Sequence, residues 1–186
     1  MIVAAKTKRE SAWLYGGGMK HVHVALPDTE YLIRIGEIAY AVSSLECTLI
    51  GDLYRCGGDL PDSLLPSQLE ALTTGSIGKI ASNAAKNMQP GPLRDYVAAC
   101  GKALKEVAEI RNDILHARPA THPDQDQRLY RANVKRENGK FVLDGRRFWI
   151  DDDYLEEQID RLNGLSHMVH EKRALVQTED ETGSTD

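Results

Sequence analysis

Apolar stripes at helical spacing constrain the fold of this chain more than any other feature of its sequence. The first stripe consists of Ile35, Ile38, Val42, Leu45, Leu49 and Leu53. Residues three and four positions apart lie on one face of an α-helix, so this stripe predicts a helix of about 25 residues. Asp28 or Thr29 can cap its start, and Gly57 with Gly58 can end it.

The same spacing predicts three more helices. One covers 75–88, the next runs from about 92 to 117, and the last begins at the acidic run 151–153. The stripe of the last helix is Leu155, Ile159, Leu162, Leu165 and Val169. Its acidic start is favourable because carboxylates stabilise the positive end of a helix dipole.

Two β-rich segments lie between the third and fourth predicted helices. They flank Asn138-Gly139 within about 128–150, and Asn-Gly between such segments is a strong signal of a β-hairpin. The preceding segment, 117–127, is polar and contains two prolines, which predicts a loop.

Together these elements predict an all-α fold, an antiparallel four-helix bundle with a β-hairpin inserted before the last helix. An apolar content of 41% with only 6% aromatic residues suits a helical core. The predicted organisation is an irregular arm over 1–27, one domain over 28–176 and a disordered acidic tail over 177–186.

Composition narrows the function classes. A formal net charge of −5 argues against a basic coat over the whole surface, although it permits a local basic patch. Three irregularly spaced cysteines form neither a disulfide framework nor a zinc motif, and no apolar run is long enough to span a bilayer. We therefore expect a cytoplasmic protein that is not inserted in a membrane, with no cofactor and no metal site.

Arg111 interrupts the stripe of the third predicted helix. It follows Val107 and precedes Leu115 by four residues each, so it lies on the face that packs against other helices. A buried guanidinium without partners is unfavourable by several kcal/mol. Either a carboxylate such as Glu46 pairs with it, which would be a structural role, or the helix seam opens there into a cleft.

Asn112 and His116 lie four residues apart on one face of the same helix. With Arg111 they offer a cation, an amide and a titrating acid/base, a set that suits a phosphodiester. The alternative is that His116 binds carbonyl groups at the helix end and that Asn112 only caps or orients.

The string Arg111-Asn-Asp-Ile-Leu-His116 resembles the R-x4-6-H motif of the HEPN superfamily, the higher eukaryote and prokaryote nucleotide-binding domains. The motif covers six residues, and the helical plan extends the similarity to roughly 28–175. The resemblance implies a metal-independent endoribonuclease of the toxin or phage-defence type, with Arg111, Asn112 and His116 as catalytic residues. Two copies of the motif would meet across a homodimer, and an antitoxin or other regulatory protein would be a further partner.

Some HEPN toxins continue the motif as H-x-Tyr, and a partner nucleotidyltransferase modifies that tyrosine. This chain has Arg118 at the position, so the resemblance does not carry this modification over, and Arg118 becomes a candidate phosphate contact. Two other hypotheses stay open. One is a catalytically inactive HEPN-like module that binds a nucleotide, RNA or a partner protein, and the other is a bundle in which Arg111 fixes the dimer register.

The hairpin region 128–147 carries seven basic side chains against two acidic ones. Aromatic residues lie among these charges, an arrangement that can hold an RNA strand by charge and stacking. The alternative is a solvated hairpin whose basic residues discourage edge-to-edge aggregation. The predicted RNA-binding residues are Arg118, Lys135, Arg136, Arg146 and Arg147.

Overall fold

The computed structural model describes residues 25–56 and 60–182. The described residues form five α-helices, a 3-10 helix and three strands. The elements are α1 (Thr29–Cys56), the 3-10 helix η2 (Asp62–Leu64), α2 (Pro66–Leu69), α3 (Thr74–Asn87), α4 (Pro92–Leu115), β1 (Arg118–His122), β2 (Asp126–Glu137), β3 (Lys140–Ile150) and α5 (Asp152–Thr182).

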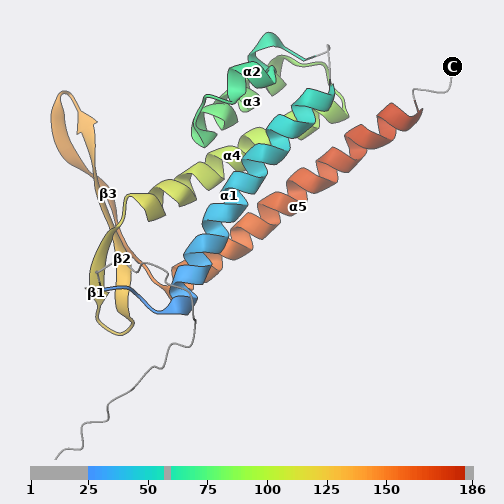
Figure 1. The fold of residues 1–186 in the computed structure, drawn as a ribbon. Coiled ribbons are helices and arrows are strands. Elements are labelled where there is room, and N and C mark those ends of the chain that lie inside the picture. The colour runs from blue at the N-terminus through green and yellow to red at the C-terminus, as the bar shows by residue number, and fades with distance from the viewer. Residues whose placement is uncertain (1–24, 57–59, 183–186) are drawn as a thin grey trace, which may run out of the picture.

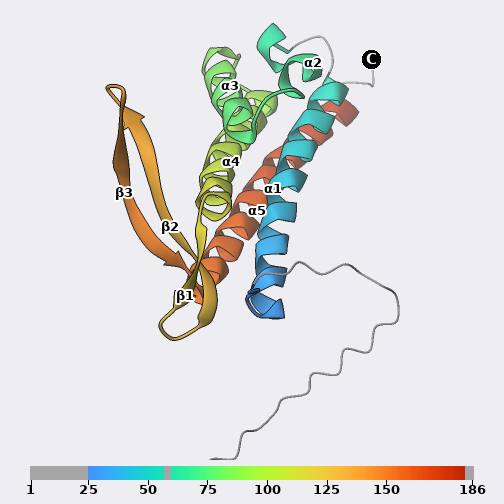
Figure 2. The same ribbon diagram turned by 60° about the vertical axis from the view of Figure 1, so that its left-hand side comes forward.

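Three long helices form the body of the molecule. The helices α1 and α5 run in the same direction, and α4 runs opposite to both (Figure 1). The helix α4 packs against α1, α5 and α3, whereas α3 lies on the outer side of α4 (Figure 2). The carboxyl end of α4, which carries the motif, points toward the base of the sheet.

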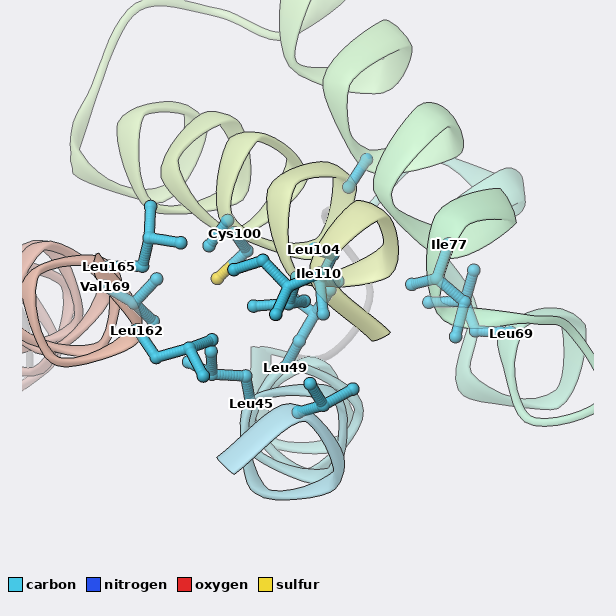
Figure 3. Close-up of a cluster of buried hydrophobic side chains, with 14 of the residues drawn as sticks. Leu45, Leu49, Leu69, Ile77, Cys100, Leu104, Ile110, Leu162, Leu165 and Val169 are labelled. Atoms are coloured by element: carbon cyan, nitrogen blue, oxygen red, sulfur yellow. The ribbon is translucent and has the colours of Figure 1, made fainter. Parts of the chain in front are cut away.

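The predicted stripes form the core between these helices. Leu45 and Leu49 of α1 meet Leu104 of α4 and Leu162 of α5 (Figure 3). All four side chains are buried. Burial of a leucine side chain contributes about 1.5–3 kcal/mol, so this interior supplies the main stabilisation of the helical body.

The prediction of a four-helix bundle with a single inserted hairpin is wrong. In the described residues, α1, α4 and α5 form the body, α3 packs on the outer side of α4, and the strands form a three-stranded antiparallel sheet in the order β1-β2-β3. The short helices η2 and α2 occupy the segment expected to be a connection. The helix α5 continues to Thr182 and so overlaps the predicted tail. Residues 1–24, 57–59 and 183–186 lie outside the described part, and the helix end expected at Gly57 and Gly58 falls among them.

The missed strand is β1, in the segment expected to be a loop. The two prolines of the segment 117–127 suggested a loop. Pro119 can occupy β1 because this strand is at the edge of the sheet and pairs with β2 alone. The β1–β2 turn is closed by the ring of His122, whose Nδ1 accepts the backbone N–H groups of Asp124 and Gln125, both at 3.1 Å. This side-chain cap replaces the glycine signal that sequence reasoning looks for.

The β2–β3 hairpin has the turn that the sequence predicted. Asn138 and Gly139 both have positive φ, at 49° and 78°, as a tight two-residue turn requires. The end of the hairpin extends away from the helices (Figure 1, Figure 2). Its base is fixed to α1, since the Tyr31 hydroxyl donates to the Ile150 carbonyl at 2.6 Å and accepts the Leu129 N–H at 3.0 Å.

Candidate functional site

Arg111 lies where α1, α3 and α4 come together around a surface pocket with a volume of about 470 Å³. The pocket is lined by Ala39, Val42, Ser43, Glu46, Cys47, Thr74, Arg111 and Leu115. Most of the lining on α1 is small, which leaves room beside the guanidinium. The seam of α4 is therefore open at the position where the sequence interrupts its apolar stripe.

The hydrogen bonds of the Arg111 guanidinium go to uncharged groups. Its Nη1 donates to the Thr74 hydroxyl at 3.3 Å, and its Nη2 donates to Asn112 Oδ1 at 3.4 Å. Its Nε is buried and has no hydrogen-bond partner within the described residues. The Thr74 hydroxyl in turn donates to Glu46 Oε2, so Glu46 is connected to Arg111 through Thr74.

This geometry orients Arg111 without neutralising it directly. Among residues 25–56 and 60–182, no carboxylate forms an ion pair with Arg111. The Thr74 hydroxyl links the guanidinium to the Glu46 carboxylate. Glu46, which the sequence suggested as a possible ion-pair partner, is linked to Arg111 through the Thr74 hydroxyl instead. A guanidinium held in this way can still bind an anion through its remaining donors.

Close packing of α3 against α4 places Thr74 at this site. A Cβ atom on Gly101 would lie 2.6 Å from the Ser82 nitrogen, and one on Gly78 would lie 2.9 Å from the Lys105 nitrogen. The two helix backbones approach so closely because both contacts are glycines. Thr74 opens α3 at the carboxyl-terminal half of α4, within reach of Arg111.

Asn112 and His116 are exposed, and His116 ends α4. Its backbone N–H donates to the Asn112 carbonyl at 3.2 Å. Five residues of α-helix correspond to a rotation of roughly 140° beyond a full turn, so Arg111 and His116 point to different sides of α4. The structure thus brings Arg111 and Asn112 into contact, while His116 faces another side of the helix end.

Asp113 is the residue within the motif that sequence reasoning missed. It is only 2% exposed, and its carboxylate accepts hydrogen bonds from Arg131 Nε at 3.0 Å and from Arg146 Nη2 at 2.6 Å. The Tyr154 hydroxyl also donates to it at 3.3 Å. Burial, and next the Asp113 carboxylate, raise the pKa of Tyr154 above its ordinary value. Asp113 therefore joins α4 to β2, β3 and α5.

A bulge in β3 places Arg146 beside Asp113. Between the paired positions Ala132–Arg147 and Val134–Leu143, a single β2 residue faces the three β3 residues 144–146. Gly145, at the centre of the bulge, has φ of 83°, which glycine adopts without strain. The bulge turns Asp144 and Arg146 toward the helices. The pKa of Asp144 is lowered because its carboxylate accepts the Arg146 backbone N–H and lies beside Arg131.

The predicted RNA-binding residues do not form one uniform surface. Arg118 and Arg147 are exposed, and neither guanidinium forms a hydrogen bond or ion pair with the described residues. Arg146 is half-exposed, but one of its nitrogens is bound by Asp113. The side chains of Lys135 and Arg136 lie outside the described part of the chain.

Two further arginines of the hairpin are structural. Arg128 is only 5% exposed and pairs with Asp28 at 2.9 Å and Asp152 at 3.0 Å, while its guanidinium lies 4.5 Å from the centre of the Tyr31 ring. Arg131 is buried between Asp113 and Asp144. The basic excess seen in the hairpin sequence is thus partly used inside the molecule.

Within the described residues, no three His, Cys, Asp or Glu side chains are placed to hold a metal ion. In the same part of the chain, the helices lack the combined length and apolar character that crossing a membrane requires. No protein-family model, curated protein or solved structure matches the chain.

Proposed function

We propose that the protein is a metal-independent endoribonuclease of the toxin or phage-defence type, whose catalytic residues are Arg111, Asn112 and His116. The main support for this proposal is how the Arg111 guanidinium is placed and bonded. Its guanidinium lines an open pocket, is oriented by Thr74 and Asn112, and makes no direct ion pair with a described carboxylate. An arginine whose role was only structural would be expected to pair with a carboxylate at such a position.

Each residue has a role in the proposed reaction. The 2′-hydroxyl oxygen of the RNA attacks the adjacent phosphorus, the bond from phosphorus to the 5′-oxygen breaks, and a 2′,3′-cyclic phosphate remains. His116 takes the proton from the 2′-hydroxyl or gives one to the leaving 5′-oxygen. Arg111 binds the phosphate oxygens and stabilises the negative charge that develops on them. Asn112 holds the guanidinium in position through its side-chain oxygen.

A homodimer completes this site. The reaction needs a base and an acid, whereas each chain offers one histidine in the motif, and that histidine points away from Arg111. A two-fold axis near the end of α4 would supply the second His116. Leu115 lines the Arg111 pocket and is 67% exposed, so it offers apolar surface for a second copy to bury.

RNA would approach along the exposed arginines beside this helix end. Arg118 opens β1, directly after the motif, and Arg147 lies on β3 opposite Ala132. Lys135 and Arg136 belong to the extended part of β2 and would add phosphate contacts farther along the strand. Replacing Arg147 with alanine should reduce the salt dependence of RNA binding, since fewer counterions are released.

The proposal is tested by incubating the purified protein with total RNA in the presence of a chelator. We expect cleavage by the wild type and its loss in Arg111→Ala and His116→Ala. Matched controls are Arg94→Ala, at the opposite end of α4, and His170→Ala, an exposed histidine of α5. Both controls should cleave like the wild type.

Cleavage that persists in His116→Ala would contradict the catalytic assignment. If the wild type binds RNA or nucleotides without cleaving any of a broad set of RNAs, the chain is the inactive binding module instead. An antitoxin or other regulatory protein remains part of the proposal, and co-purification with the expressed protein would identify one.

A further inference from the structure

A second pocket lies on the opposite side of α4 from Arg111. It has a volume of about 290 Å³ and is enclosed by α4, β3 and α5. Its α4 lining, Glu109, Ile110 and Asp113, belongs to another face of the helix than Arg111 and Leu115. This volume is at the lower end of the range for ligand sites, so a single planar group fits it better than a larger ligand.

Gln158 contributes an amide to the lining of this pocket. The residue is only 5% exposed, and its amide makes no hydrogen bond with the described residues. Such an amide is available to bind water or a ligand in the pocket. An amide offers two donors and one acceptor, so it can recognise a ligand that carries both kinds of group.

Aromatic rings form the wall beside this amide. The Phe148 and Tyr154 rings lie 5.2 Å apart, and both residues line the pocket. The guanidinium of Arg146 lies 5.5 Å from the centre of the Phe148 ring. Aromatic faces and guanidinium planes are the surfaces on which unpaired nucleic-acid bases stack.

The charges around the pocket are negative in excess, which favours a neutral base over a phosphate. Three carboxylates line it against two guanidinium groups, those of Arg146 and Arg161. Both arginines are already paired, with Asp113 at 2.6 Å and with Glu106 at 2.8 Å. Glu109 and Glu157 have no such partner among residues 25–56 and 60–182, so they can accept N–H groups of a ligand.

We propose that this pocket, lined by Gln158, Glu109, Glu157, Phe148 and Tyr154, binds an unpaired guanine base. Guanine offers adjacent N1–H and N2–H donors to a carboxylate, and its O6 and N7 atoms accept from the Gln158 amide. Adenine and cytosine present only one amino group beside an acceptor, and uracil presents one ring N–H between two acceptors. The donor-rich edge of guanine therefore matches the two free carboxylates best.

As a site on an RNA substrate, the pocket rests on the proposed function. Asp113 precedes His116 by three residues, which is a rise of roughly 4.5 Å along α4. A guanine in the pocket would thus lie close to the level of the proposed proton-transfer group. We expect RNA cleavage to occur at phosphates next to an unpaired guanosine.

The test titrates nucleosides, which carry no phosphate, into the protein and follows the heat of binding by calorimetry. We expect saturable binding of guanosine, with an affinity at least about ten-fold higher than for adenosine, cytidine or uridine. Gln158→Met keeps the length of the side chain but removes its amide, and should weaken guanosine binding about ten-fold. Gln68→Met, on the exposed surface of α2, should leave it unchanged.

Equal affinity for all four nucleosides, or no binding of guanosine, would overturn the inference. So would unchanged guanosine affinity in both Gln158→Met and Glu157→Gln, the latter at an exposed position where the fold is not at risk. The same titration in His116→Ala should match the wild type. If guanosine binds but the wild type cleaves no RNA, the pocket stands and the proposed function fails; if RNA is cleaved but guanosine does not bind, the reverse holds.

Discussion

Alanine substitution of two charged residues of the motif should affect stability very differently, with a large loss for Asp113 and a small loss for Arg111. Asp113 is buried and holds two arginines, one of which, Arg131, is itself only 7% exposed. Removing one partner of a buried ion pair destabilises a protein by about 3–5 kcal/mol, because the remaining charge stays buried. At about 2–4 °C per kcal/mol for a domain of this size, Asp113→Ala should lower the melting temperature by about 6–20 °C.

Arg111→Ala removes much less stability. Its two hydrogen bonds, at 3.3 and 3.4 Å, are long and go to uncharged groups. A hydrogen bond of this kind contributes about 0.5–1.5 kcal/mol, and the substitution also removes a buried Nε that has no partner among the described residues. We expect a loss of no more than about 2 kcal/mol in stability, and, under the proposed function, a loss of about 10²–10³ in cleavage rate.

The assay combines thermal melting by circular dichroism with RNA cleavage per folded molecule. Lys105→Ala, an exposed position of α4, is the matched control and should change neither quantity. The reasoning is refuted if Arg111→Ala lowers the melting temperature as much as Asp113→Ala does. It is also refuted if Asp113→Ala melts like the wild type, because the buried carboxylate would then not hold the sheet to α4.

Three further outcomes are expected. Gly101→Ala should destabilise the protein by about 1–3 kcal/mol in chemical denaturation, because its Cβ would lie 2.6 Å from the Ser82 backbone, and an unchanged midpoint would contradict the close packing of α3 and α4. The pKa of Asp28 lies below its ordinary value of 3.8 because its carboxylate accepts the backbone N–H of Tyr31 in the first turn of α1. The ionised Asp28 therefore contributes fully to folding stability above pH 3.8, and this contribution is lost as the pH falls through the lowered pKa. Acid unfolding of Asp28→Asn should therefore depend less steeply on pH below about 4 than that of the wild type. Cys47 is exposed in the Arg111 pocket, whereas burial raises the pKa of Cys100 to about 12. Iodoacetamide should therefore modify Cys47 before Cys100, and bound RNA should slow the reaction of Cys47, as read by peptide mass spectrometry.

Helices with a clear apolar stripe could be predicted from the sequence. The stripe of α1 is buried from Ile38 to Leu53, and three helices start close to the expected positions, at Thr29, Pro92 and Asp152. The Asn138-Gly139 turn was equally predictable, because few residues other than asparagine and glycine adopt positive φ at low cost. These features depend on local sequence, which is why periodicity and turn chemistry reveal them.

Features that depend on tertiary contacts could not be predicted in this way. The strand β1 contains proline and polar residues, and it forms because β2 supplies the hydrogen bonds at its edge. The burial of Asp113 depends on Arg131 and Arg146, which are distant in sequence; Arg131 lies on β2, and Arg146 lies in the β3 bulge. Arg111 was identified from its interruption of a stripe, but its partner Thr74 carries no signal beyond its place at the start of a helix.

The most direct test of the account is the chemistry of the RNA ends that the protein produces. A defined RNA with a single unpaired guanosine is incubated with the wild type in the presence of a chelator, and the fragments are identified by mass spectrometry. The account predicts a 2′,3′-cyclic phosphate on one fragment and a 5′-hydroxyl on the other, and no cleavage when the 2′-hydroxyls are methylated. Fragments with a 3′-hydroxyl and a 5′-phosphate, or cleavage that persists in His116→Ala, would contradict it.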